Sequence, residues 1–295
     1  MDGDGLLDIV SCSWHGKRIE WYRNPGKLGP LWSVTLVEEN GHFECGDLWD
    51  IDGDGKALEI LPATLHTAWY EVGTLADGSR GLVKHLVSKE ADHWDGGVGD
   101  VNGDGRPDIL RPATWFEAPR DPRSGQWKQH PLAVGHEEEG RADHTPQILV
   151  YDVNEDGLND LITSVAHRYG IFWYEQSMKK GRRTWKRHLI DDSWSQPHSL
   201  VLADLNEDGD RDLVTGKRYK AHNGNDPGAF EPLGVYWYEL ERGATPRWVK
   251  HNLSFNEGIG SAYSLPVEDL DKDGDLDIVV TGKWGGPAWF ENRRK

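Results

Sequence analysis

The sequence predicts an all-β fold, a β-propeller of four-stranded antiparallel blades, and three observations support this class. An acidic motif occurs six times, and each copy is followed by a short apolar run. The copies recur about every fifty residues, which is the length of one propeller blade. An aromatic segment such as FWYEQ or YWYEL also recurs once in each period. We therefore expect six blades, with seven as the alternative.

Each period predicts the same order of four strands. An apolar strand leads into the acidic motif, and a β-branched strand such as PDILRPA follows it. The aromatic segment is the third strand, and a segment of the form W-x-x-H-apolar, such as TWKRHLI, is the fourth. The first aspartates of five copies lie at 50, 100, 152, 204 and 269, and an insertion at 217–232 lengthens the last step.

The two ends of the sequence predict incomplete blades. The first blade lacks its first strand, and the last blade stops after its third, at Asn292. A closed ring would need roughly thirty further residues for the two missing strands. We expect one domain over residues 1–295 that is incomplete at the N-terminus, with a gap or a loosened seam between its first and last blades.

The acidic motif predicts a calcium loop between two strands. Side-chain oxygens stand at positions 1, 3, 5 and 9, with glycine at position 6, and calcium prefers six to eight oxygen ligands. An EF-hand would need glutamate at position 12, where the five copies with a first position have Leu61, Arg111, Thr163, Thr215 and Val280. The alternative is an Asx-rich turn that binds nothing.

Up to six calcium sites follow from these copies. The second copy has Leu58 at position 9, so a bulge must bring Glu59 in, and the first copy lacks position 1. The predicted ligands are Asp2, Asp4 and Asp8; Asp50, Asp52, Asp54 and Glu59; Asp100, Asn102, Asp104 and Asp108; Asp152, Asn154, Asp156 and Asp160; Asp204, Asn206, Asp208 and Asp212; and Asp269, Asp271, Asp273 and Asp277.

The composition limits which partners the protein could bind and indicates where it is located. The formal charge of −17 argues against nucleic acid and against an anionic membrane as partners. No apolar run approaches the length of a membrane span. Loops of this kind usually need the millimolar calcium found outside the cytosol, so we expect a secreted or periplasmic protein. Two cysteines do not indicate a disulfide scaffold.

The histidines divide into two groups. Four recur in the fourth strand, where packing or hydrogen bonding is expected: His85, His130, His188 and His251. The others lie at or near the strand ends opposite the acidic loops, which ring the central opening of a propeller. The candidate catalytic residues there are His93, His144, His167, His198, Lys217, Arg218 and Tyr263. Imidazoles suit proton transfer at neutral pH, and two or three could hold a transition metal such as zinc.

The motif D-x-[DN]-x-D-G-x-x-D followed by an apolar strand resembles FG-GAP/VCBS repeat propellers over nearly the whole chain. The segments HSLVLADLNEDG and SVAHRYGIFWYE are also similar to the propeller part of aldos-2-ulose dehydratase and, more loosely, to propeller polysaccharide lyases. This chain lacks the cupin and second propeller of the dehydratase.

The resemblance to these enzymes implies a sugar or a uronate-containing glycan as substrate and elimination as the reaction. His144 or His198 would be the base. Lys217, Arg218 or a histidine-bound metal would stabilise the enolate. Tyr263 or His167 would protonate the leaving oxygen.

A non-catalytic module is the alternative function, because FG-GAP/VCBS propellers commonly serve in adhesion or as accessory domains. Such a module would bind a glycan or a protein through aromatic side chains near the histidine face. The expected stacking platforms are Trp14, Trp94, Trp194 and Trp284. A scaffold that binds no ligand is a third possibility.

Overall fold

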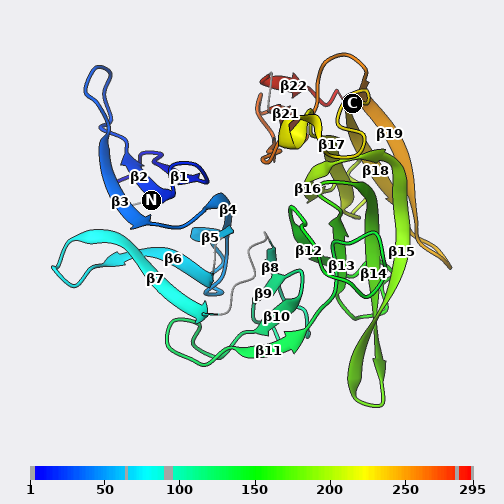
Figure 1. Cartoon of the computed structure of the whole chain (residues 1–295), viewed down its shortest axis with the longest axis horizontal. Helices are drawn as coiled ribbons and strands as arrows, with labels where there is room; N and C mark the ends of the chain where they lie inside the picture. The colour runs from blue at the N-terminus through cyan, green and yellow to red at the C-terminus, as the bar shows by residue number, and fades with distance from the viewer. Residues whose placement is uncertain (1–3, 64–65, 90–95, 283–285, 294–295) are drawn as a thin grey trace. The chain divides into compact units, whose positions relative to one another are not determined.

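The computed structural model describes residues 4–63, 66–89, 96–282 and 286–293. These residues form six successive antiparallel sheets, four with four strands and two with three, each a meander in chain order (Figure 1). The all-β class and the six propeller blades predicted from the sequence are thereby confirmed. Within the described residues, the first sheet begins with the second strand of the pattern and the last sheet ends with the third, also as predicted.

The chain divides into two compact units, Met1–Asp100 with Asp104–Pro131, and Val101–Gly103 with Leu132–Lys295. The first unit holds three sheets. Their strands are β1 (Ile9–Ser13), β2 (Arg18–Arg23) and β3 (Ser33–Glu39); β4 (Glu44–Trp49), β5 (Glu59–Ala63), β6 (Thr67–Thr74) and β7 (Arg80–Ser88); and β8 (Gly97–Gly99), β9 (Asp108–Arg111), β10 (Thr114–Glu117) and β11 (Lys128–Pro131).

The second unit also holds three sheets. Their strands are β12 (Ile148–Tyr151), β13 (Asp160–Ser164), β14 (Tyr169–Lys179) and β15 (Arg182–Ser195); β16 (Pro197–Ala203), β17 (Asp212–Lys217), β18 (Gly234–Glu241) and β19 (Arg247–Phe255); and β20 (Val267–Glu268), β21 (Asp277–Val280) and β22 (Ala288–Phe290). A short 3₁₀ turn, Ala221–Gly224, lies in the insertion between β17 and β18. The expectation of one domain over the whole chain stays a prediction.

Each core lies between successive sheets of one unit. In the second unit, Ile162 and Trp173 of the fourth sheet pack with Leu213 and Tyr236 of the fifth. In the first unit, Trp21 of the first sheet packs with Ile60 and Tyr70 of the second. The sheets are apolar on both faces where they stack. The sequences of their inner strands are therefore continuous apolar runs. This packing fixes the strand ends that carry the polar sites.

The repeated histidine of the fourth strand has the structural role that the sequence predicts. In four sheets it stacks on the tryptophan of the third strand, with ring centroids 4.1–4.4 Å apart. Its Nε2 lies 2.7–2.8 Å from the glutamate two residues beyond that tryptophan. The four histidines are His85, His130, His188 and His251, and the four glutamates are Glu71, Glu117, Glu175 and Glu239.

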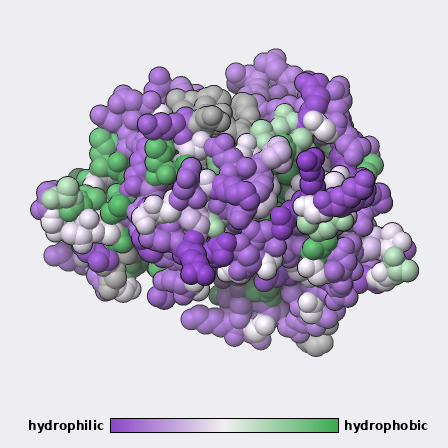
Figure 2. Space-filling view, turned by 90° about the horizontal axis from the view of Figure 1, so that it is seen from below, coloured by the Kyte–Doolittle hydropathy of each residue, from purple (hydrophilic) through white to green (hydrophobic). Residues whose placement is uncertain are grey.

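Polar side chains dominate the face drawn in Figure 2, where apolar residues appear as separate patches. This surface agrees with the large negative charge of the sequence. In the part of the chain that the structure describes, no helix has the length and apolar character needed to cross a membrane.

Candidate functional site

The acidic loops share one backbone fold. In five of them the amide of the glycine at position 6 donates to Oδ2 of the first aspartate over 2.7–3.2 Å. Those glycines have φ between 82° and 107°, a region that side chains disfavour. The loop therefore closes over its first carboxylate and carries the oxygens at positions 3 and 5 around it.

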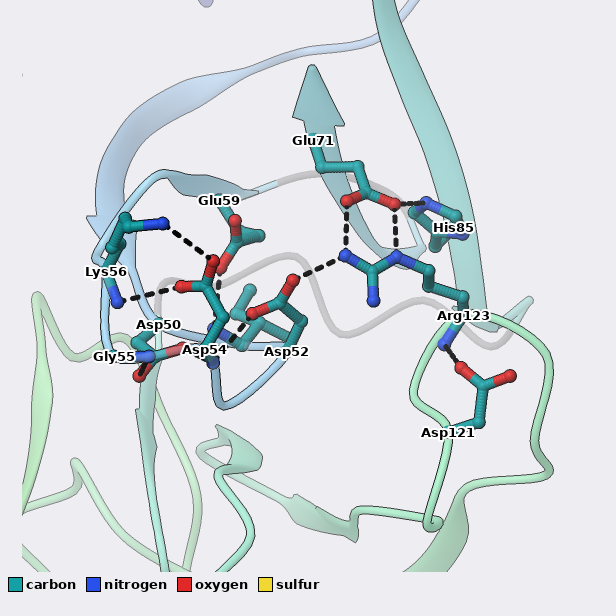
Figure 3. A network of polar contacts seen from close by, with 11 residues as sticks. Asp50, Asp52, Asp54, Gly55, Lys56, Glu59, Glu71, His85, Asp121 and Arg123 are labelled. Atoms are coloured by element: carbon teal, nitrogen blue, oxygen red, sulfur yellow. Dashed lines mark hydrogen bonds and ion pairs between the residues drawn. The ribbon is translucent and has the colours of Figure 1, made fainter. Parts of the chain in front are cut away.

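In the second loop, position 9 is Leu58 and the next residue is Glu59. The carboxylates of Asp50, Asp52 and Glu59 offer three ligand atoms that lie within 4.8 Å of one another (Figure 3). Glu59 is the first residue of β5, and its Oε2 accepts a hydrogen bond from the amide of Ile51 at 3.0 Å. Burial, with the charges of Asp52 and Asp54, raises the pKa of Glu59 to about 7. A bound cation would remove this electrostatic penalty.

An arginine from another loop of the first unit partly neutralises this acidic group. The guanidinium of Arg123 pairs with Asp52 and makes two 2.7 Å hydrogen bonds to Glu71 (Figure 3). Lys56 lies 3.4 Å from Asp54. In the last loop, Asp269, Asp271 and Asp273 form a second set of ligand atoms within 4.8 Å. The hard oxygen donors in both loops fit calcium.

The aspartate at position 9 is buried and anchors the third strand. Asp160 accepts hydrogen bonds from the amide of Val153 at 3.2 Å, from Nε1 of Trp173 at 2.8 Å and from the amide of Gln176 at 2.7 Å. Burial raises its pKa to about 6. Equivalent hydrogen bonds run from backbone amides at or just after the end of the strand that carries the aromatic segment to Asp8, Asp108, Asp212 and Asp277. These residues hold the loop to its blade, and their part in binding calcium stays a prediction.

The second unit brings four of the predicted catalytic residues together. His144 precedes β12, His167 follows β13, His198 lies in β16 and Tyr263 precedes β20. In each of these sheets the acidic loop lies between the first two strands, and these four residues lie at the opposite strand ends. The imidazoles and the carboxylate loops therefore occupy opposite ends of the same sheets.

His167 is the centre of the resulting histidine cluster, which we define as His144, His167, His198 and His222. The ring centroid of His167 lies 4.7 Å from that of His144, 5.6 Å from that of His198 and 4.5 Å from that of His222. Tyr263 packs edge-on against His198, with centroids 4.9 Å apart. Its hydroxyl is buried without a hydrogen-bond partner, as is Nδ1 of His198.

The inner imidazoles are neutral at physiological pH. Burial, together with the charge of Arg218 and the neighbouring histidines, lowers the pKa of His167 to about 3. The same causes hold the pKa of His198 well below its ordinary value. Neutral imidazoles can accept a proton or coordinate a metal. Among the described residues, however, sets of three ligand atoms within 4.8 Å occur in acidic loops and not in this cluster. A zinc ion here stays an untested expectation.

Two carboxylates that the sequence analysis did not single out hold the outer imidazoles. Asp143 Oδ1 lies 2.8 Å from Nδ1 of His144, and Asp226 lies 2.9 Å from Nδ1 of His222. Asp143 is adjacent in sequence to its histidine, and Asp226 follows its own by four residues. Such acidic neighbours of a histidine are the only signal in the sequence that could have identified them.

Lys217 is the last residue of β17, where the insertion begins. Its fully buried Nζ donates to the carbonyls of Ser195 at 3.0 Å and Gly228 at 2.8 Å, and to Oγ of Ser195 at 2.5 Å. Burial lowers its pKa to about 8, although Glu231 opposes the shift. The three donors of the ammonium thus hold the insertion at Gly228 against the end of β15. Its predicted role towards an enolate stays untested.

Several predicted residues cannot be placed in a site. Asp2, His93, Trp94 and Trp284 lie outside the described residues. Trp194 was expected to be exposed, which is wrong, because it is 6% exposed and its Nε1 donates to the hydroxyl of Tyr238 at 2.8 Å. Trp14 is 39% exposed and packs on His42 with centroids 4.7 Å apart.

Comparison with known proteins finds similarity in parts of the chain that contain the repeat. FG-GAP-like repeats match residues 1–61 and 152–215. The chain is also similar to integrin alpha-IIb of Homo sapiens, with 33% identity over 95 residues, and of Mus musculus, with 32% over 95 residues. These alignments cover 31% of this chain and 9% of either integrin. The four copies of the acidic motif within these two ranges are thus similar to FG-GAP-like repeats.

Proposed function

We propose that this propeller is a carbohydrate lyase or dehydratase that uses the histidine cluster for proton transfer. The observation that supports this most strongly is the convergence of His144, His167 and His198 with Tyr263 at one end of the second unit. The segments that carry the resemblance to sugar-eliminating enzymes contain His167 and His198 themselves. Titratable groups from four strand ends have no evident structural reason to meet there.

His144 is the proposed base. Asp143 holds its Nδ1 at 2.8 Å, so the neutral ring presents Nε2 as the proton acceptor. In the proposed reaction, Nε2 takes a proton from a sugar carbon adjacent to a carbonyl or carboxylate. The electron pair of that C–H bond first delocalises onto the carbonyl or carboxylate oxygen as an enolate. It then returns to form the new C=C bond as the neighbouring C–O bond breaks. Tyr263 donates its phenolic proton to the leaving oxygen and is later reprotonated from solvent.

The positive charge near the buried imidazoles supports the intermediate. Arg218 is 8% exposed, and its charge helps to lower the pKa of both His167 and His198. The same field would stabilise the negative charge of an enolate, which is the main electrostatic requirement of this reaction. His167 and His198 stay neutral and would donate or accept hydrogen bonds to sugar hydroxyls.

The acidic loops have a structural role in this proposal. Up to six calcium ions would neutralise carboxylates at the strand ends away from the cluster and so hold the blades in register. A calcium requirement of this kind favours a secreted or periplasmic protein.

The test is a screen of ketosugars and uronate polysaccharides for the ultraviolet absorbance of an unsaturated product. We expect one class to react, and we expect His144→Gln to lower the rate by about a hundredfold or more. His251→Gln is the matched control, because His251 forms a similar pair with Glu239 at 2.8 Å in the fourth strand of its sheet. Equal rates for the two variants would contradict the proposal, as would no product from any substrate.

A binding module is the second candidate, and the similarity to integrin alpha-IIb favours it. In that case a glycan or protein would bind without being converted. Saturable binding of a uronate glycan with unchanged affinity in His144→Gln, and with no product, would support this candidate over the lyase.

A further inference from the structure

The insertion between β17 and β18 contributes a fourth imidazole to the histidine cluster. The ring of His222 packs edge-on against His167, with centroids 4.5 Å apart and planes at 76°. The proposed reaction assigns His222 no role. His222 follows His167 in the sequence, whereas His144 precedes it, and both rings pack against the ring of His167.

The pairing of His222 with a carboxylate reproduces that of His144. Nδ1 of His222 lies 2.9 Å and 3.0 Å from the two carboxylate oxygens of Asp226. The guanidinium of Arg218 lies 3.9 Å from the same carboxylate. A carboxylate at Nδ1 fixes the tautomer of a neutral imidazole and makes Nε2 the basic nitrogen.

The backbone around His222 adopts a conformation that side chains rarely tolerate. Lys220, His222 and Asn223 have φ of 48°, 46° and 59°, in the left-handed region. Both the amide and the side chain of Asn225 donate to the carbonyl of His222, at 3.3 Å and 2.8 Å. Strain that the surrounding structure maintains in this way is concentrated at functional sites.

Exposure distinguishes His222 from the other rings of the cluster. Its side chain is 56% exposed and that of His144 is 34% exposed, whereas His198 is 3% exposed and His167 is half-buried. A proton that leaves a substrate inside the site must reach water through a group that contacts both. His222 contacts His167 on one side and solvent on the other.

Resting on the proposed function, we propose that His222 is the proton shuttle between the cluster and solvent, and that Asp226 is its positioning residue. After elimination, His167 takes the proton from Nε2 of His144 on one ring nitrogen as it gives its own proton from the other to Nε2 of His222, so His167 itself stays neutral. His222 then releases a proton to water or buffer. The cycle changes no oxidation state and restores every ring to its neutral form.

The positioning step can be tested without a substrate, by long-range ¹H–¹⁵N NMR of the histidine rings in slightly alkaline buffer. We expect His222 to be the Nδ1–H tautomer in the intact chain and to lose this preference in Asp226→Ala. Glu239→Ala is the matched control, and it should change His251 and leave His222 as it was. An Nε2–H tautomer of His222 in the intact chain would overturn the inference.

The shuttle itself is tested with whichever sugar the intact chain converts. We expect His222→Gln to lower turnover about tenfold or more in dilute buffer and added imidazole to restore it, with no such rescue for His144→Gln. His251→Gln should behave as the intact chain does. Turnover of His222→Gln that matches the intact chain at every buffer concentration would overturn this inference alone. Failure of the intact chain to convert any sugar would overturn the proposed function, and the shuttle with it.

Discussion

At the residue scale, the second unit contains a half-buried carboxylate in β15 that lies outside the acidic loops. Asp191 accepts hydrogen bonds from the hydroxyl of Tyr238 at 2.6 Å and from Nζ of Lys250 at 2.8 Å. Burial alone would raise the pKa of Asp191, but hydrogen bonds from Lys250, Tyr238 and Ser193 lower it to about 2. This carboxylate therefore joins the fourth and fifth sheets through its charge.

Replacing Asp191 by asparagine should destabilise the fold in a pH-dependent way. The folded pKa of Asp191 is depressed from 3.8 to about 2, so its contribution is present above about pH 4 and is lost as the pH falls through about 2. We expect Asp191→Asn to cost about 2 kcal/mol at pH 7, measured by urea unfolding. The difference from the intact chain should shrink steadily below pH 4. A constant difference across that range would show that the carboxylate charge is not involved.

At the element scale, each acidic loop should act as one unit with the strands that it joins. In the fourth loop the first aspartate is Asp152. Its carboxylate accepts hydrogen bonds from two backbone amides, that of Asp156 at 3.2 Å and that of Gly157 at 2.9 Å. His144 precedes one of the joined strands and His167 follows the other, so the loop sets the separation of these two rings through β12 and β13.

Asp152→Ala should remove one bound calcium ion and lower stability by about 1–3 kcal/mol, because two loop amides lose a charged acceptor. Calcium content by metal analysis and urea unfolding in calcium-containing buffer measure both effects. The control is Asp192→Ala, which removes the same charge at an exposed position outside the loops. Equal calcium content in the two variants would show that this loop binds no ion.

The sequence predicts these elements well where the pattern is periodic. The spacing of the acidic copies and the tryptophan–glutamate–histidine pattern follow from one blade geometry, so both the six sheets and the role of His188 could be predicted. The insertion has no period. The approach of His222 to His167, and of Asp226 to His222, depends on left-handed backbone at Lys220 and His222, which no repeat indicates.

Burial of single aromatic residues was equally hard to predict. Trp194 lies at the end of β15, where the repeat pattern suggests an exposed rim. The hydroxyl of Tyr238 and the carboxylate of Asp191 satisfy its indole nitrogen instead, so it is part of the core. Prediction from one blade at a time misses the contact with Tyr238, because that residue comes from the neighbouring sheet.

At the scale of the whole molecule, the net charge of −17 makes folding without cations electrostatically unfavourable. Carboxylates in the loops repel one another when no ion is bound. We expect chelation of calcium to lower the melting temperature by several degrees or more, measured by calorimetry, and added calcium to restore it. Because salt screens this repulsion, high ionic strength should reduce the loss. An unchanged melting temperature after complete calcium removal would contradict the role assigned to the loops.

The account rests on proton transfer by the histidine cluster, whose three predicted rings lie at the strand ends opposite the acidic loops. The most direct measurement is the initial rate of unsaturated-product formation from a uronate polysaccharide or ketosugar by the intact chain, His144→Gln and His198→Gln, with calcium content measured in each. The account predicts product with the intact chain and a large loss of rate in both variants at unchanged calcium content. Full activity in either variant, or no product from the intact chain with its calcium bound, would contradict it.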